Sequence, residues 1–445
     1  MERIRNFQFG KVIKNFSKRR LSDEIVYVIS DILNKGIAFI CLPLYTSKMT
    51  VSDFGLFSVY QVYASIFTIF MGISLSRAVV LYYISNKDNN KKLTTVIWIT
   101  IISSLIFTLI IYFLQFLNMI DINSVILLVL LISTLFGSFY SVGLEVIRAN
   151  KKAIRYCTIN IVNVILTNLI SLILIFTSTA DSVFLRLISI LLVNVTFGLL
   201  FLISIIKENG FGYDVNTGIY FLKYSLPLIP FSLASLMLSY FDRLFLEHYR
   251  NALEVGLYSF AYNIGMFLFA IVVALNRAIQ PHFFDNYNDQ LKIKHYMKKN
   301  FYIFSFMYFA FILLVKPAVI ILGNIDYMNS IFILPLIALG LAFYYLYSIY
   351  ENVLLYNKNS KAVAIISLIS LVITILSNYL LIPTYGYFGA AISTIVSYFS
   401  LFAIIFFYVK AKYDYKVFSN KFLLFVIFIY TICPIIEIVF FNFKF

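Results

Sequence analysis

Histidine and cysteine, the residues most often used as metal ligands and nucleophiles, are scarce in this sequence. There are three of each among 445 residues, and neither an HExxH pattern nor a GxxxxGK[ST] loop occurs. The missing patterns argue against a metal hydrolase and a built-in ATPase. The cysteines Cys41, Cys157 and Cys433 stand alone in apolar runs, and the histidines His248, His282 and His295 fall in loops. We therefore predict buried thiols, no catalytic residues, no metal site and no cofactor.

Charged residues are scarce as well. They make up 12% of the chain, whereas hydrophobic residues make up 62%. Soluble globular proteins are nearer a quarter charged and half apolar, so this composition indicates an integral membrane protein. The net charge of +15 could suggest a nucleic-acid partner. We exclude that partner because the basic residues sit in short gaps between apolar runs and form no solvated basic face.

The apolar runs are long enough to cross a bilayer. About 20 apolar residues in a helix span about 30 Å of hydrocarbon. The sequence predicts an all-α integral membrane protein with thirteen such runs, at 25–46, 57–80, 93–117, 122–147, 154–177, 183–206, 220–241, 254–280, 300–323, 328–350, 362–382, 387–409 and 421–441. The first run is too long, and too interrupted by polar residues, to be a cleaved signal peptide.

The distribution of basic residues predicts the orientation in the membrane. The N-terminal tail and alternate gaps hold 25 of the 35 Lys and Arg residues, and the opposite side holds four. Because cytoplasmic loops carry an excess of Lys and Arg, the N-terminus is predicted to be cytoplasmic. The odd number of runs then places the C-terminus outside.

Charges inside the runs are few and mostly positive. A charge at the centre of a membrane helix costs about 2.5–3.5 kcal/mol, so it normally faces protein or a wet cavity. Asp31, Glu145 and Glu437 oppose six in-run cations, which are Lys35, Arg77, Arg186, Lys223, Arg277 and Lys316. We expect Arg186, Lys223 and Lys316 to reach the membrane surface from near helix ends. Lys35 lies mid-run, one turn after Asp31, so it could form an Asp31–Lys35 pair, an anion site, or both.

An internal repeat relates the two halves of the chain. "FGLFSVY" at 54–60 aligns with "VGLYSFA" at 255–261 at an offset of 201, and Arg77 aligns with Arg277 at an offset of 200. Six runs separate the copies, so both cross the membrane in the same direction. This predicts a cytoplasmic basic tail (1–24), two parallel six-helix lobes (25–206 and 220–409) around a cationic chamber, and an additional C-terminal helix (421–445).

The chain also resembles a known family. "PLIPFSLASLMLSYFDRLFLEHYRNALEVGLYSFAYNIG" at 227–265 is similar to the central signature of polysaccharide and O-antigen flippases, in the MATE/oligosaccharidyl-lipid flippase (MOP) superfamily. Two further runs, 42–61 and 385–394, resemble that family's first-hairpin and twelfth-helix patterns. Thirteen runs depart from the family's usual twelve or fourteen.

The resemblance implies a function and partners. It implies twelve core helices and export of an undecaprenyl-diphosphate-linked oligosaccharide to the outer leaflet of the bacterial cytoplasmic membrane. The implied partners are this lipid-linked oligosaccharide, membrane lipids and other polysaccharide-assembly proteins.

The residues suggest roles that fit this substrate. Lys35, Arg77 and Arg277 are predicted to bind the diphosphate, because guanidinium and ammonium groups suit phosphate oxygens. Asp242 and Arg243 end the seventh run and are predicted to form a gate or latch. Asp31 and Glu145 are the candidate ion-coupling acids of the core runs. Pro227 and Pro230 can bend the seventh run or act as its hinge.

Two other function classes stay open at this point. A multidrug or cation antiporter of the same superfamily would need carboxylates in its cavity, whereas the runs hold six bases against three acids. A membrane glycosyltransferase or polysaccharide polymerase typically needs a sizeable extramembrane loop. The longest internal gap here, about 282–299, is polar and predicted to be cytoplasmic.

The predicted orientation can be tested with single cysteines in a cysteine-free background. A cysteine in the 87–92 loop should be shielded from an impermeant external thiol reagent, because that loop lies on the lysine-rich side. A cysteine replacing Thr50 should react, because Thr50 lies on the opposite side. Labelling of intact cells with the opposite pattern would reverse the assigned orientation.

Overall fold

The computed structural model describes residues 23–85, 93–120, 122–415 and 417–442, and within these ranges the chain is helical with no strand. The α-helices are α2 (Asp23–Thr46), α3 (Val51–Gly72), α4 (Leu75–Ser85), α5 (Thr94–Phe116), α6 (Ser124–Ala149), α7 (Ala153–Thr177), α8 (Ser182–Asn209), α9 (Val215–Ser225), α10 (Leu228–Tyr249), α11 (Ala252–Asp285), α12 (Gln290–Leu313), α13 (Val315–Leu322), α14 (Leu334–Tyr356), α15 (Ser360–Tyr413) and α16 (Asn420–Asn442). A 3₁₀ segment, η2 (Ile325–Phe332), precedes α14.

Most of these helices are long and apolar enough to cross a membrane. Ten of the described helices qualify by length and hydropathy, and the pair α12 and α13, bent by 58°, can form an eleventh span. Each of the thirteen predicted runs overlaps a helix. The all-α, multi-pass membrane fold predicted from the sequence is therefore confirmed.

Helix α15 is a hairpin of two spans rather than one 54-residue rod. Gly386 has φ 56° and ψ −134°, which interrupts the helical path, and only glycine adopts such a backbone readily. The Thr374 hydroxyl donates to Ser397 at 2.7 Å, and the Ser377 and Ser393 hydroxyls are 2.6 Å apart. These pairs join the two arms antiparallel, so the runs 362–382 and 387–409 cross separately.

Two spans are broken inside the membrane-spanning region. Helix α3 ends at Ile73 and Ser74, whose φ values of 44° and 52° are left-handed, and α4 then begins. Helix α9 ends just before Pro227, and α10 begins just after it. Leu226 and Pro227 keep right-handed helical dihedrals, so the interruption reflects the proline nitrogen, which cannot donate a helical hydrogen bond, and the bend or hinge at Pro227 and Pro230 stays a prediction.

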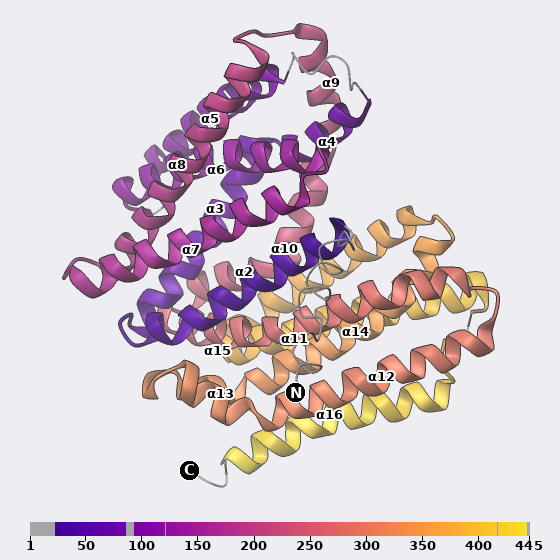
Figure 1. Ribbon diagram of the computed structural model, residues 1–445. Coiled ribbons are helices and arrows are strands. Elements are labelled where there is room, and N and C mark those ends of the chain that lie inside the picture. Colours follow the sequence, from indigo (N-terminus) through magenta and orange to yellow (C-terminus); the bar gives the residue numbers. More distant parts are fainter. Residues whose placement is uncertain (1–22, 86–92, 121, 416, 443–445) are drawn as a thin grey trace, which may run out of the picture.

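The helices form two bundles, which we call the N-terminal bundle (α2–α9) and the C-terminal bundle (α10–α16). Figure 1 shows them as an upper and a lower group of ribbons, with α2 lying along their boundary. The main packing between the bundles is α3 against α10 and α11, with α2 adding contacts to α11 and α13. That the bundles are two copies of one repeat, with the boundaries given above, stays a prediction.

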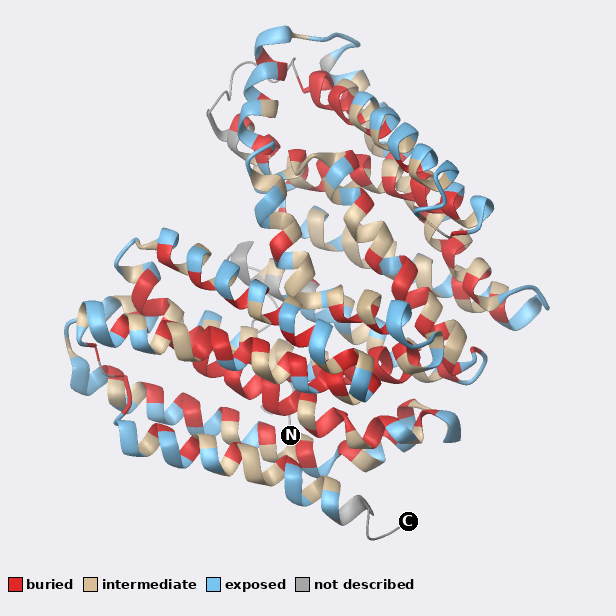
Figure 2. Ribbon diagram, turned by 180° about the vertical axis from the view of Figure 1, so that it is seen from behind, coloured by how far each residue is buried: buried red, intermediate tan, exposed pale blue. Residues whose placement is uncertain are grey.

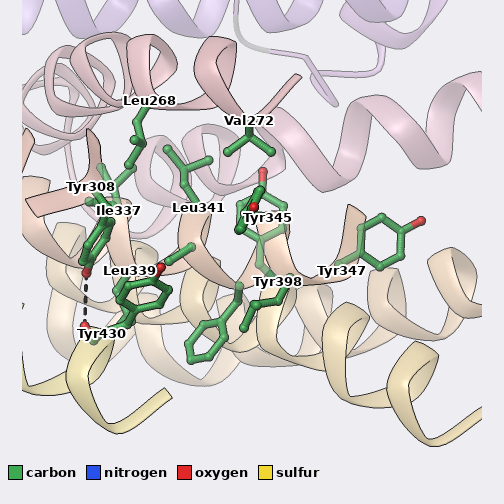
Figure 3. Packing of buried hydrophobic residues seen from close by; sticks show 14 of the residues in the cluster. Leu268, Val272, Tyr308, Ile337, Leu339, Leu341, Tyr345, Tyr347, Tyr398 and Tyr430 are labelled. Atoms are coloured by element: carbon green, nitrogen blue, oxygen red, sulfur yellow. Dashed lines mark hydrogen bonds between the residues drawn. The ribbon is translucent and has the colours of Figure 1, made fainter. Parts of the chain in front are cut away.

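Helix α14 is the core of the C-terminal bundle. It is almost wholly buried between α11, α12, α15 and α16, and Figure 2 shows the red buried ribbon concentrated there. Figure 3 shows Tyr345 and Ile337 of α14 among side chains from α11, α12 and α15. The Tyr308 hydroxyl donates to the Tyr430 carbonyl oxygen at 3.0 Å, which ties the extra helix α16 to α12.

The bundles meet at one end of the molecule. A Cβ atom added to Gly55 would overlap the carbonyl oxygen of Ala252, and one added to Gly256 would overlap the carbonyl oxygen of Val51. Both pairs are related by the 201-residue offset of the repeat. The two glycines therefore let the first turns of α3 and α11 cross backbone to backbone, as small residues do between membrane helices.

We call this end, with its turns at 47–50, 250–251 and 323–324, the contact end. The Thr46 hydroxyl donates to the Leu322 carbonyl oxygen at 2.7 Å, and the Asn324 amide donates to the Thr46 carbonyl oxygen at 3.3 Å. At the opposite or far end, the turns bond within their own bundle, as Tyr83 does to Asn150 (2.8 Å). Figure 1 shows the bundles diverging toward the far end.

Because α3 and α11 cross so closely, replacing a crossing glycine by alanine should destabilise the protein, although alanine normally stabilises a helix relative to glycine. Gly256→Ala should destabilise the protein by about 1–3 kcal/mol, the range seen when a well-packed site is overfilled. Gly36→Ala is the matched control, because the space around Gly36 is open and alanine normally favours a helix by about 0.5–1 kcal/mol over glycine. Thermal unfolding in detergent measures both. Equal melting temperatures for the two variants would show that the crossing is not close.

Candidate functional site

Three predicted anion-binding cations come from three helices and are exposed. Lys35 lies on α2, Arg77 on α4 and Arg277 on α11. The Lys35 Nζ atom is 5.3 Å from the centre of the Phe269 ring of α11, and the Arg77 Cζ atom is 5.6 Å from the centre of the Phe231 ring of α10. Each cation of the N-terminal bundle thus rests on an aromatic ring of the C-terminal bundle.

This arrangement places the cations along the boundary between the bundles. Arg277 follows Phe269 by eight residues on α11, a rise of about 12 Å toward the far end. Next to it, the Asn352 amide of α14 donates to Asn276 at 2.7 Å. Lys35 therefore lies at the boundary near the middle of α11, and Arg277 is exposed on α11 about two turns nearer the far end.

Of the two predicted ion-coupling acids, Glu145 and Asp31, the structure describes the side chain of Glu145 only. Glu145 forms an ion pair with Arg148, one turn later on α6, with an N–O distance of 3.1 Å. It also lies within electrostatic range of Arg77. The side chain of Asp31 lies outside the described part of the chain, so the Asp31–Lys35 pair stays a prediction, as does coupling at either acid.

Asp242 and Arg243 are buried inside the C-terminal bundle. The Tyr258 hydroxyl of α11 donates to the Asp242 carboxylate, and the Arg243 backbone N–H donates to the same carboxylate at 2.8 Å. The Arg243 guanidinium lies 4.9 Å from the centre of the Tyr240 ring and 5.2 Å from that of Tyr262. The gate or latch role remains a prediction, and its contacts in this conformation join α10 to α11.

A polar cluster continues from Asp242 into α15. The Tyr258 and Thr394 hydroxyls are 2.9 Å apart, and those of Tyr262 and Tyr398 are 3.3 Å apart. A cavity of about 10 Å³, room for about one water, lies between these groups. The amide of Asn378 lines this cavity, is buried and makes no hydrogen bond within the described residues.

The sequence did not single out this polar cluster. Its members come from α10, α11 and the two arms of α15, which are far apart in the chain. A signal was present, because Ser393, Thr394 and Ser397 recur at helical spacing in the second arm.

Arg186 lies among aromatic side chains. Its guanidinium carbon lies 3.8 Å from the ring centres of both Tyr45 and Phe57, which are buried. Its Nη1 atom is 3.7 Å from the sulfur of Met49, in the turn at 47–50 of the contact end. Aromatic faces can hold a guanidinium away from water, and no local pattern in the sequence indicates that these rings would meet. That Arg186 reaches the membrane surface stays a prediction. Lys223, by contrast, is exposed in the last turn of α9.

The arrangement can bind an anionic group between the bundles. Lys35 and Arg77 are exposed beside ring faces, and exposed ammonium and guanidinium groups attract phosphate oxygens. The polar cluster around Asp242 lies deeper in the C-terminal bundle. No group of three or more His, Cys, Asp or Glu side chains in the described ranges could hold a metal ion.

The fold is similar to solved transporters of the MOP superfamily. The lipid II flippase MurJ, in its inward closed conformation, aligns with a TM-score of 0.70 at 16% identity, covering 94% of this chain and 98% of MurJ. A multidrug resistance MATE transporter in its inward-facing conformation aligns with a TM-score of 0.61 at 15% identity, covering 85% of this chain and 95% of that one. These likenesses establish the MOP fold.

Two proteins of Haemophilus influenzae are similar in sequence. The "Lsg locus putative protein 1" is 27% identical over 376 residues, covering 80% of this chain and 89% of that protein. An uncharacterized membrane protein is 28% identical over 274 residues, covering 60% of this chain and 65% of that protein, slightly under two thirds of its length.

The sequence also matches a protein-family model, and this match identifies the family. The model described as polysaccharide biosynthesis protein matches residues 21–287, which is more than half of the chain. The match takes in the crossing of α3 and α11 and all three exposed cations of the boundary. The chain therefore belongs to the polysaccharide biosynthesis protein family.

Proposed function

We propose that this protein is a flippase for an undecaprenyl-diphosphate-linked oligosaccharide, such as a polysaccharide or O-antigen repeat unit. It moves the substrate from the cytoplasmic to the outer leaflet of the bacterial cytoplasmic membrane by alternating access between the bundles. The observation that carries the proposal is the pair of exposed cations at the bundle boundary, Lys35 and Arg77, with Arg277 exposed on α11, in a chain of this family. A lipid diphosphate carries about two negative charges, and guanidinium groups bind phosphate with paired donors.

The conformation fits one stage of such a cycle. With the N-terminus in the cytoplasm, the contact end lies outside and the far end lies in the cytoplasm. The glycine crossing and the Thr46 and Asn324 hydrogen bonds then close the outer side. The bundles diverge at the far end (Figure 1), and the three cations are exposed. In the proposed cycle they therefore accept the substrate from the cytoplasm, where it is made.

The charges favour this function over the alternatives. A cation antiporter would need carboxylates on the bundle boundary, yet Glu145 is paired with Arg148 and Asp242 is buried in the C-terminal bundle. A glycosyltransferase or polymerase would need a domain for sugar chemistry outside the membrane. The described connections between helices are short turns.

The two arginines give the sharpest test. Arg77→Ala and Arg277→Ala should each lower the flipping rate by about tenfold, because a hydrogen bond to a charged group contributes about 1.5–3 kcal/mol. Lysine at either position should restore activity in part, since it keeps the charge but loses the paired donors. Flipping of a fluorescent lipid-linked oligosaccharide in proteoliposomes measures the effect.

Arg155→Ala is the matched control for both variants. Arg155 is exposed at the far end in the first turn of α7, away from the boundary cations, so its loss should leave flipping unchanged. Expression and melting temperature should match across all variants. Full activity in the Arg77→Ala/Arg277→Ala double variant would refute the assigned diphosphate site.

The sign of the substrate charge predicts a dependence on membrane potential. Moving one elementary charge across 100 mV is worth about 2.3 kcal/mol, so outward movement of a dianion from a negative cytoplasm gains roughly 4–5 kcal/mol. The same potential, negative inside, also favours the return of the empty, positively charged site toward the cytoplasm. A potassium diffusion potential set with valinomycin, without proton or sodium gradients, should therefore drive net export. A rate independent of the size and sign of that potential would show that the charge is compensated in transit.

A further inference from the structure

A second basic site lies apart from the bundle boundary, between the end of α11 and the start of α12. It is a cavity of about 450 Å³ at the far end of the C-terminal bundle. This volume is within the range of small-molecule sites, about 300–1,000 Å³. The translocation function proposed above does not use it.

Basic side chains and apolar surface line this cavity together. His282 comes from the last turn of α11, and Lys292 and His295 come from the first turns of α12; all three are exposed. The ring centres of His282 and Tyr296 are 4.8 Å apart, so the tyrosine braces the imidazole. Phe283 and Leu291 supply apolar wall. The lining therefore suits a ligand that is both anionic and apolar.

The start of α12 adds to the attraction for an anion. Its first backbone N–H groups lie at the positive end of the helix dipole. Asp289 caps this end by accepting from the Lys292 N–H at 3.1 Å, and it pairs with the Lys292 ammonium at 3.1 Å. These contacts lower the pKa of Asp289. Because both side chains are largely exposed, this ion pair is weak, and Lys292 can turn to a stronger anion.

The exposed face of α12 continues from the cavity into the membrane. Leu291 is 80% exposed, and along the same face Tyr302 and Phe306 are 61% and 68% exposed. Between them lie His295 and Lys298, both exposed. The half of α12 that carries Tyr302 and Phe306 lies in the predicted run 300–323, so we expect this exposed face to meet lipid. Basic groups followed along the helix by an apolar, exposed stripe match the head and the tail of an anionic amphiphile.

We propose that this cavity binds the headgroup of an anionic phospholipid from the leaflet at the far end. The phosphodiester lies against His282, Lys292 and His295, and an acyl chain follows Tyr302 and Phe306 along α12. Basic pockets between membrane helices are suited to such headgroups. A free phosphate would use the basic groups but leave the apolar stripe unused, which is why we assign the site to a lipid.

The test measures lipid binding to the purified full-length protein by native mass spectrometry. Phosphatidylglycerol and phosphatidylcholine with the same acyl chains are titrated separately. The wild type should bind phosphatidylglycerol more tightly. Lys292→Gln/His295→Gln should bind it at least about fivefold more weakly, the equivalent of about 1 kcal/mol for one basic contact. Both residues are exposed, so the double variant should fold normally, with an unchanged melting temperature as the check.

Lys152→Gln/Arg155→Gln is the matched control. It removes two exposed basic side chains from the far end of the N-terminal bundle, where the cavity they line is only about 60 Å³. Its affinity for phosphatidylglycerol should equal that of the wild type. An equal loss in this control, or equal binding of phosphatidylcholine by the wild type, would overturn the proposal. Displacement of the lipid by millimolar inorganic phosphate would assign the cavity to soluble anions instead. The assay contains no oligosaccharide substrate, so its outcome is independent of the flippase proposal.

Discussion

The close crossing of α3 and α11 is the contact on which the rest of the structure depends. At Gly55 and Gly256 the two backbones touch, which no other residue type would allow. Because the main packing between the bundles runs through α3, this crossing fixes where the molecule is closed. Beyond the crossing the bundles still touch, as the Arg77 guanidinium does at the Phe231 ring, but their far ends diverge (Figure 1). A larger side chain at either glycine would move both the closed end and the open end.

Aromatic rings lie against several cations of the membrane-spanning region. Lys35, Arg77 and Arg243 each lie near a ring face, and Arg186 lies between two. A carboxylate would satisfy such a cation but would also cancel its charge and occupy its donors. A ring covers one face of a guanidinium and leaves the edge with its N–H groups available. This explains how a chain with 81 Phe and Tyr residues and few acids can keep a usable positive charge within a bilayer.

The helices could be predicted from the sequence, and the contacts between them mostly could not. Apolar runs of membrane length force helices, and Pro227 forces a break, so both follow from local chemistry. The repeated glycine motif was also visible, because its spacing survives in the sequence. The cage around Arg186 was not, since Tyr45 and Phe57 come from other helices and no local pattern pairs them. The cluster around Asp242 was missed for the same reason, because α10, α11 and both arms of α15 contribute to it.

The repeat predicts two equivalent arginines, but the backbone makes them different. Arg77 follows the left-handed residues Ile73 and Ser74, so α4 starts afresh and its direction is independent of α3. Arg277 lies on α11, which continues unbroken from the glycine crossing. A left-handed β-branched residue such as Ile73 is costly, and surrounding packing must offset that cost. Equal spacing from the two aligned glycines, Gly55 and Gly256, therefore does not give the two arginines equal positions. Arg277 is rigidly coupled to the crossing through α11, whereas Arg77 lies on α4 against the Phe231 ring.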